Sequence, residues 1–234
     1  MTPPAPSPAT PDTGLVRTRI WDLPTRLFHG LLAVTVTGVL ATGWTGVMDW
    51  HFRLGYAVLA LLLFRLVWGF MGGHWSRFAA FVHGPRSVAG YLRGQAHPDH
   101  LIGHNPLGSL SVFAMLAVLA LQVATGLVAD DAITYAGPLA HTVSGATSSL
   151  ATGWHAEQGK WVVVALIALH LAALLYHGLV RRQRLMASMI TGDKVLSRAT
   201  PVTPSRDDAA MRLLALAVFA GCVAVAVWIG TMRP

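Results

Sequence analysis

The sequence predicts an all-α integral membrane protein, built as a four-helix bundle that is followed by a fifth, C-terminal transmembrane helix. Hydrophobic residues make up 54% of the 234 residues and charged residues only 12%, a balance outside the usual range of soluble globular domains. Five apolar windows are long enough to span the hydrocarbon core of a bilayer, which takes about 20 residues in a helix. Only the second window carries a formal charge, Arg65.

The predicted elements follow in a simple order along the chain. Residues 1–15 are rich in proline, serine and threonine and lack the basic region and apolar core of a cleavable signal, so we expect a disordered N-terminal tail. The transmembrane helices are predicted at 27–47, 54–70, 107–129, 161–180 and 213–232. Four of them form a membrane domain at 16–194, and a linker at 195–210, rich in proline, serine and aspartate, leads to the additional helix at 211–234.

Local signals mark two further features. Asn105 and Pro106 precede the third apolar window, and this helix should start there because asparagine favours the N-cap and proline the first turn. The long polar connection before it contains the stretch FVHGPRSVAGYLRG, which predicts a short amphipathic helix on the membrane surface. Cys222, within the last window, is expected to be a small apolar packing residue.

The distribution of basic residues predicts the orientation of the chain. With the N-terminus in the cytoplasm, the connections on the opposite side contain only Arg53, Lys160 and Arg233 as basic residues. The positive-inside rule therefore places the N-terminus in the cytoplasm and the C-terminus on the opposite side of the membrane. The net charge of +7 suits contact with anionic membrane lipid and requires no nucleic acid.

Histidines inside the apolar windows carry the functional prediction. An ionisable side chain at membrane depth is costly unless it has a partner, and a neutral imidazole has one when it binds iron. His29 lies near the start of the first helix, and His51 near the start of the second. On the fourth helix, His155 and His170 are 15 residues apart, about 22 Å along the helix axis.

These depths predict two pairs of imidazoles, His29 with His170 toward the cytoplasm and His51 with His155 toward the outside. Four-helix bundles build cofactor sites from side chains on facing helices, and two axial histidines are the ligand set of a six-coordinate b-type haem. The sequence thus predicts two haem b groups, with these four histidines as cofactor-binding and metal-binding residues. His177, seven residues after His170 on nearly the same face, is the alternative to His170.

Two other groups of residues leave alternatives open. Arg65 either pairs with a haem propionate or extends its charged head to the lipid headgroups. The spacing of His97, His100 and His104 suggests a zinc site, but no thiolate or clear fourth ligand accompanies them. We therefore expect a solvated loop, with His104 belonging to the segment that starts the third helix.

The chain resembles the bacterial cytochrome b561 family, which includes the b-type cytochromes of nickel–iron hydrogenases. The resemblance covers about residues 16–194 and lies in VRTRIWDLPTRLFHGLLA, HFRLGYAVLALLLFRLVWGFMG, GHNPLGSLSVFAMLAVLALQVATGL, GKWVVVALIALHLAALLYH and LMASMITGDK. It implies a di-haem membrane cytochrome b, with ligand positions that fall on His29, His51, His155 and His170. The stretch WHAEQGKW departs from the family's H-E-W-like start of the fourth helix, and the fifth helix lies outside the family's usual core.

We therefore expect a membrane cytochrome that relays electrons between a quinone pool and a redox partner, either a c-type cytochrome or a hydrogenase- or dehydrogenase-like subunit. The sequence contains no recognisable nucleophile, phosphate loop or hydrolytic arrangement, so the task of the protein is to hold the haems and tune their potentials. An enzymatic role would be that of a quinone oxidoreductase or of a cytochrome b subunit in an oxidoreductase complex. The alternative is a transporter or channel whose intramembrane histidines and Arg65 move protons or a metal ion.

Overall fold

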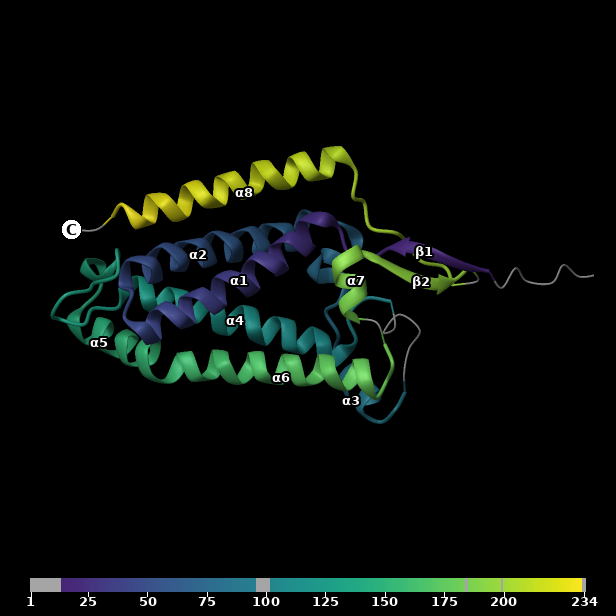
Figure 1. Ribbon diagram of the computed structural model, residues 1–234, viewed down its shortest axis with the longest axis horizontal. Helices are drawn as coiled ribbons and strands as arrows, with labels where there is room; N and C mark the ends of the chain where they lie inside the picture. Colours follow the sequence, from purple (N-terminus) through teal and green to yellow (C-terminus); the bar gives the residue numbers. More distant parts are fainter. Residues whose placement is uncertain (1–13, 96–101, 184, 199, 233–234) are drawn as a thin grey trace, which may run out of the picture.

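The computed structural model describes residues 14–95, 102–183, 185–198 and 200–232 (Figure 1). Most of the predicted tail at 1–15 therefore lies outside the described residues. In chain order, the elements are β1 (Leu15–Arg19), α1 (Leu23–Thr45), α2 (Met48–Met71), α3 (Pro85–Leu92), α4 (Pro106–Val128), α5 (Gly145–Gly153), a π-helical turn (Trp154–Gly159), α6 (Lys160–Leu179), α7 (Leu185–Thr191), β2 (Asp193–Ser197) and α8 (Ala209–Gly230). Short 3-10 turns lie at His74–Ser76, Phe78–Ala80 and Ala140–Thr142.

The five predicted transmembrane helices are confirmed. Helices α1, α2, α4 and α8 and the continuous run Gly145–Leu179 are each long and apolar enough to cross a bilayer. This run starts earlier than the predicted window at 161–180, because Ser144 accepts a hydrogen bond from the backbone N–H of Thr147 and begins α5 within a polar stretch. The helix of 35 residues is thus longer than its apolar part alone indicates.

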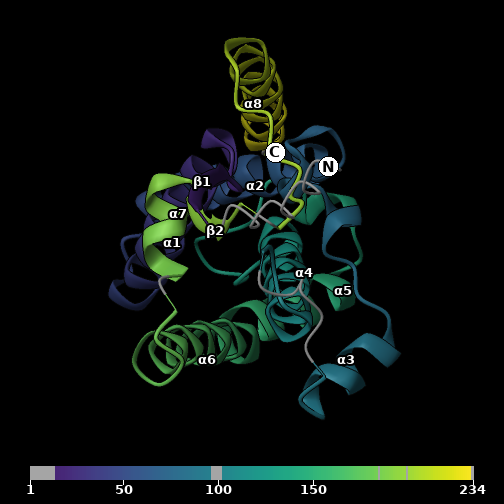
Figure 2. The same cartoon turned by 90° about the vertical axis from the view of Figure 1, so that its right-hand side faces the viewer.

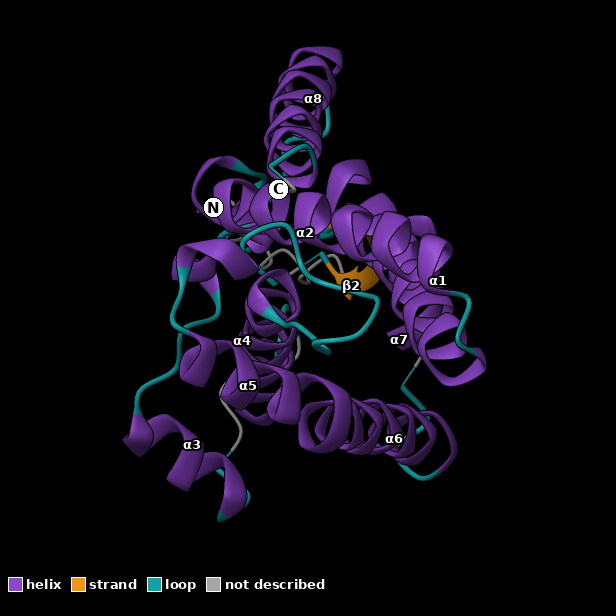
Figure 3. Cartoon of the chain, turned by 90° about the vertical axis from the view of Figure 1, so that its left-hand side faces the viewer, coloured by secondary structure: helices purple, strands orange, loops and turns teal. Residues whose placement is uncertain are grey.

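The long helices lie side by side along the longest dimension of the molecule (Figure 1). Viewed along this direction, α1, α2, α4 and α6 surround the middle of the bundle, and α8 stands outside it against α2 (Figures 2 and 3). One end of the bundle carries β1 and β2, and we call it the sheet end. The other, the far end, carries the loop that follows α4.

The sheet end is fastened by a small antiparallel sheet and a buried carboxylate. Strand β1 pairs with β2 from Leu15 opposite Ser197 to Arg19 opposite Asp193. Asp22 is fully buried and accepts hydrogen bonds from the backbone N–H groups of Thr25 and Gly73, each at 2.8 Å. It thereby caps α1 and joins the start of α1 to the end of α2, as expected of an N-cap aspartate.

Both local sequence signals around α4 are confirmed. The side chain of Asn105 accepts a hydrogen bond from the backbone N–H of Gly108 at 2.7 Å, and Pro106 is the first residue of α4. The amphipathic helix predicted before it is α3, which lies at the periphery of the sheet end (Figure 2). Since proline also opens α3, both helices begin with a residue that has no N–H to leave unpaired.

The predicted linker at 195–210 is held closely to the sheet end in its described part. The hydroxyl of Ser205 donates to the carbonyl of Ile20 at 2.6 Å and accepts from the backbone N–H of Trp75 at 3.2 Å. Asp207 accepts hydrogen bonds from Arg19 and Arg212. These contacts fix the start of α8, whose residues Ala215 and Cys222 pack against Phe64 and other side chains of α2. Cys222 is buried in this apolar contact, as expected of a packing residue.

The middle of the bundle is apolar. Val36 of α1, Val58 of α2, Leu119 of α4 and Val163 of α6 are buried and form one cluster, which we call the central layer. Each of the four core helices contributes one residue to it. The central layer lies between the sheet end and the far end and separates the polar side chains of the two halves.

Candidate functional site

His29 and His170 face each other in the half of the bundle nearer the sheet end. His29 is on α1, His170 is on α6, and their ring centres are 6.3 Å apart at an interplanar angle of 52°. Taken as whole residues, His29 is exposed and His170 is half-buried. We call these two residues the sheet-end pair.

His51 and His155 form the corresponding far-end pair. The ring centres of His51, on α2, and His155, in the π-helical turn, are 5.9 Å apart at an interplanar angle of 83°. The Nδ1 atom of His51 lies 3.0 Å from the carbonyl oxygen of Val39, and that of His155 lies 2.8 Å from the carbonyl oxygen of Gln122. A carbonyl oxygen accepts, so both Nδ1 atoms carry the proton, and both Nε2 atoms are left unprotonated, the form in which an imidazole nitrogen can bind a metal.

Two glycines make these hydrogen bonds possible. A Cβ atom on Gly43 would lie 3.2 Å from the ring of His51, and one on Gly126 would lie 2.6 Å from the ring of His155. Each glycine follows the accepting residue, Val39 or Gln122, by four positions, which is one helical turn. The imidazole therefore crosses the neighbouring helix where a side chain would otherwise stand. Both members of the far-end pair thus have a glycine one helical turn after the residue whose carbonyl they contact.

The distances within both pairs fit two imidazoles bound to one iron. A metal–imidazole nitrogen bond is about 2 Å long, and adding the ring radius on each side places the two ring centres about 6 Å apart. The observed values are 5.9 Å and 6.3 Å. The donor set also fits, since neutral imidazole is a common axial ligand of haem iron.

The π-helical turn fixes the position of His155. A π turn contains one residue more than an α turn, and such turns occur frequently at functional sites. The side-chain Nε2 of Gln122 donates to the carbonyl oxygen of His155 at 2.8 Å, while the carbonyl oxygen of Gln122 accepts from the ring. Gln122 thus holds both the backbone and the side chain of His155.

The remaining histidines do not join these pairs in the described part of the chain. His177 contacts the side-chain oxygen of Gln183 through Nδ1, at 3.1 Å, and its ring packs against Tyr176. His74 and His141 lie in 3-10 turns away from the helix pairs. His97 and His100 lie outside the described residues. No group of three or more histidine, cysteine or acidic side chains arranged to hold a metal ion occurs among the described residues.

His104 lies directly before the N-cap of α4, in the segment that starts this helix, as predicted, but its ring is not solvated. Its ring packs between Trp21 and Phe81, with ring centres 4.8 Å and 4.7 Å away, because the polar connection before α4 folds back onto the sheet end. Burial and the positive charges of Arg65 and Lys194 lower the pKa of His104 to about 3. This histidine is therefore neutral at physiological pH.

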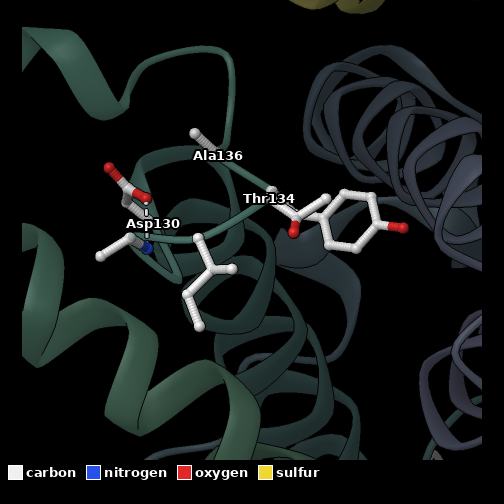
Figure 4. A pocket seen from close by; sticks show the side chains of 6 residues that line it. Asp130, Thr134 and Ala136 are labelled. Atoms are coloured by element: carbon white, nitrogen blue, oxygen red, sulfur yellow. Dashed lines mark hydrogen bonds between the residues drawn. The ribbon is translucent and has the colours of Figure 1, made fainter.

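The loop at the far end contains a shallow pocket that lies apart from the imidazoles. Asp130, Ile133, Thr134 and Tyr135 are among the residues that line it (Figure 4). Hydrogen bonds from the backbone N–H groups of Ile133, Tyr135 and Thr134 lower the pKa of the neighbouring Asp131. The carboxylates of Asp130 and Asp131 thus order the loop itself.

The apolar helices and the paired imidazoles between them define an integral membrane protein of the b-type cytochrome class. The profile of the prokaryotic cytochrome b561 family matches residues 20–192, and the chain belongs to this family. Membership implies b-type haem and a role in membrane electron transfer.

Curated relatives of the chain carry closely similar names. It is 26% identical to a probable Ni/Fe-hydrogenase B-type cytochrome subunit of Azotobacter vinelandii, over 78% of this chain and 90% of the relative. It is 22% identical to a probable Ni/Fe-hydrogenase 1 B-type cytochrome subunit of Escherichia coli K12, over 74% and 88%. It is 23% identical to a probable Ni/Fe-hydrogenase B-type cytochrome subunit of Cupriavidus necator, over 75% and 86%. No solved structure matches the chain significantly.

The sequence predicted the two histidine pairs, but it did not show which residues hold the histidine rings in place. Gln122 is a single polar residue in an apolar helix, and its position at membrane depth is the signal that could have identified it. Gly43 and Gly126 were visible in the sequence, but ordinary packing of small residues between helices explains such glycines equally well. The contact with an imidazole is evident only from the structure.

Proposed function

We propose that the chain binds two haem b groups, one between His29 and His170 and the other between His51 and His155, and relays electrons across the bilayer. The observation that carries this proposal is the spacing of the two imidazole pairs, 6.3 Å and 5.9 Å between ring centres. When bound, each haem supplies an iron that accepts and releases one electron. The protein supplies axial ligands, orientation and an apolar surrounding.

The residues around the far-end pair have defined roles in this proposal. The carbonyl oxygens of Val39 and Gln122 accept the Nδ1 protons of His51 and His155. These hydrogen bonds fix the tautomer and the ring orientation and raise the basicity of the ligand nitrogen. Gly43 and Gly126 keep the space through which the rings reach these carbonyls.

We further propose that the electrons pass between a quinone pool and a hydrogenase-type redox partner, in a bacterial inner membrane with the N-terminus in the cytoplasm and the C-terminus in the periplasm. The names of the curated relatives support the hydrogenase partner, and the distribution of basic residues supports the orientation. Both a c-type cytochrome and a dehydrogenase-like subunit are other partners consistent with a membrane cytochrome b. A site for the quinone should lie close to one of the haems.

A pyridine haemochrome assay on the purified full chain tests the haem assignment. We expect two haems per chain, and one haem fewer in each of the variants His29→Ala, His51→Ala, His155→Ala and His170→Ala. His177→Ala is the matched control on α6 and should keep both haems. A His177→Ala variant with one haem, together with a His170→Ala variant with two, would overturn the assignment on α6. A wild-type chain without haem would remove the proposal altogether.

The partner is tested by adding hydrogen to native membranes and recording the reduced haem bands. Reduction of the haems by hydrogen, lost when His29 or His155 is replaced by alanine, is the result expected for a hydrogenase partner. Reduction by quinol or formate but not by hydrogen, with a different co-purifying subunit, would assign the chain to another complex.

A further inference from the structure

Arg65 is a buried charge that forms no ion pair with the residues that the structure describes. It lies on the membrane-spanning helix α2, its side chain is only 4% exposed, and its Nη1 atom is buried without a hydrogen-bond partner in the structure. The guanidinium stacks on Phe78 at 4.6 Å and lies 5.8 Å from the ring of Phe81. The head group therefore does not extend to the lipid headgroups. A buried charge that lacks an opposite charge is strongly destabilising, so a counter-charge is needed.

The acidic residues described near Arg65 do not supply this counter-charge directly. Asp22 acts on Arg65 electrostatically, but its carboxylate oxygens already accept from Thr25, Gly73 and Trp68, and no ion pair joins it to Arg65 among the described residues. Asp193 and Asp207 form ion pairs with Arg19, and Asp207 also pairs with Arg212. The charge of Arg65 is thus only partly balanced by the protein.

Two further buried nitrogen atoms at the sheet end lack hydrogen-bond partners in the described part of the chain. The Nδ1 atom of His104, whose ring packs on Phe81 beside Arg65, is also buried without a partner, and so is the Nε atom of Arg26. Lys194 acts electrostatically on His104. Arg65 and the neutral imidazole of His104, both with unpaired nitrogen atoms, form a suitable environment for an anionic group with several oxygen acceptors.

Helix geometry places both arginines at the level of the sheet-end pair. Arg65 follows His51 by fourteen residues on α2, which is about 21 Å along the axis with a net rotation of about 40°. Arg65 therefore shares the inward face of His51 and lies one layer nearer the sheet end. Arg26 precedes His29 by three residues and shares its face of α1.

We infer that Arg65, with His104 beside it, binds a carboxylate of the cofactor held by His29 and His170. This inference rests on the proposed haem at the sheet-end pair, since the propionate side chains of haem b are its carboxylates. A bidentate guanidinium–carboxylate pair neutralises the buried charge and fixes the orientation of the macrocycle. Arg65 is thus a cofactor-binding residue of the sheet-end site, and no corresponding buried arginine accompanies the far-end pair in the described part of the chain.

Infrared spectroscopy with labelled haem tests this inference on the intact chain. Cells are fed 5-aminolevulinate that carries ¹³C at its carboxyl carbon, so the haem propionates become the labelled carboxylates of the purified protein. Redox difference spectra then identify the ¹³C-sensitive bands. We expect Arg65→Gln to shift these bands and to lower the midpoint potential of one haem, because a positive charge near the iron is removed. Arg65→Lys should shift the bands less, since the charge remains and the bidentate geometry is lost.

Arg53→Gln is the matched control, because Arg53 is on the same helix and exposed. It should leave the labelled bands unchanged. Identical ¹³C-sensitive bands in wild type, Arg65→Gln and Arg65→Lys, with both haems retained, would overturn the inference. If Arg65→Gln fails to bind haem, the ¹³C-sensitive bands of Arg65→Lys test the inference instead. Loss of haem in both, reproduced by Asp22→Asn, would show that Arg65 only balances Asp22 and would equally overturn the inference.

The outcomes separate this inference from the proposed function. If the wild-type chain contains no haem, the proposed function fails. If it contains two haems and the labelled propionate bands do not change when Arg65 is replaced, only the assignment of Arg65 fails.

Discussion

Two glycines set how closely the far-end imidazoles approach their neighbouring helices. At Gly126 an added Cβ would lie 2.6 Å from the ring of His155, whereas at Gly43 it would lie 3.2 Å from the ring of His51. The first distance requires a movement of the ring, and the second requires only a small adjustment. The two positions therefore differ in how much a methyl group disturbs the ligand.

We expect Gly126→Ala to destabilise the haem-bound protein by about 1–3 kcal/mol, the usual cost of overpacking, and to displace His155 from its carbonyl acceptor. Gly43→Ala should have a smaller effect of the same sign. Gly55→Ala, on α2 with no atom within 4 Å of the added Cβ, is the control. Haem content and the low-spin electron paramagnetic resonance signal report the change. A normal far-end signal in Gly126→Ala would contradict this view of the glycine.

The carboxylate of Asp131 makes the far-end loop sensitive to pH. Hydrogen bonds from Ile133, Tyr135 and Thr134 lower its pKa, so the folded loop favours the ionised form. The stabilisation is therefore complete above the ordinary pKa of aspartate and is lost as the pH falls through the lowered value. We expect weaker protection from amide hydrogen exchange at residues 133–135 below about pH 4, measured against the exchange rate of an unstructured peptide at the same pH. Asp131→Asn should show fast exchange already at neutral pH, and an unchanged exchange rate would contradict the prediction.

At the scale of elements, the π-helical turn Trp154–Gly159 determines where the fourth transmembrane segment directs His155. One additional residue in a turn rotates the following positions by about 100° relative to a regular α-helix. Gln122 stabilises this turn through the carbonyl oxygen of His155. The geometry of the ligand thus depends on a residue of another helix.

We expect Gln122→Leu to weaken binding of the far-end haem while the sheet-end haem stays in place. The substitution removes the hydrogen bond that Gln122 donates to the carbonyl oxygen of His155, and the loss of one hydrogen bond costs about 0.5–1.5 kcal/mol. The midpoint potential of one haem should change, and the other should not. Gln158→Leu is the matched control, because Gln158 is an exposed glutamine of the same π-helical turn. Equal effects of both substitutions would rule out a positioning role for Gln122.

The sequence predicted the helices well because length and apolar composition determine them, and Asn105 with Pro106 fixed the start of α4. It did not predict the sheet of β1 and β2, since these strands of five residues lie far apart in the sequence: Leu15 pairs with Ser197 and Arg19 with Asp193. The pairing of His29 with His170 was predicted from their depth in the membrane alone. The buried position of His104 could not be predicted, because it depends on how a polar connection folds back against Trp21.

At the scale of the whole molecule, α8 and the segment before it contribute differently. Helix α8 packs on the outer face of α2 through apolar side chains, a face that lipid could also cover. The segment before it hydrogen-bonds to Ile20, Trp75 and Arg19, which belong to the sheet end. Lipid cannot replace the hydrogen bonds that this polar segment makes to the sheet end.

We expect a chain that ends after residue 208 to keep both haems and most of its thermal stability. A chain that ends after residue 198 also loses Ser205 and Asp207, and its haem absorbance should disappear at a lower temperature in the same detergent. The reason is that Ile20 and Trp75 then lack their hydrogen-bond partners. Equal stability of the two truncated chains would show that the segment before α8 is dispensable.

The central layer of Val36, Val58, Leu119 and Val163 has a consequence for energy conversion. Hydrocarbon side chains offer water molecules nothing to bond to, so the side chains of this layer do not support a chain of waters that carries protons. In the proposed function, only electrons then travel from one leaflet to the other. Each such transfer moves one elementary charge through the membrane voltage, which corresponds to about 2.3 kcal/mol per 100 mV. Because protons do not accompany the electrons through this hydrocarbon layer, the redox reaction adds to the membrane voltage.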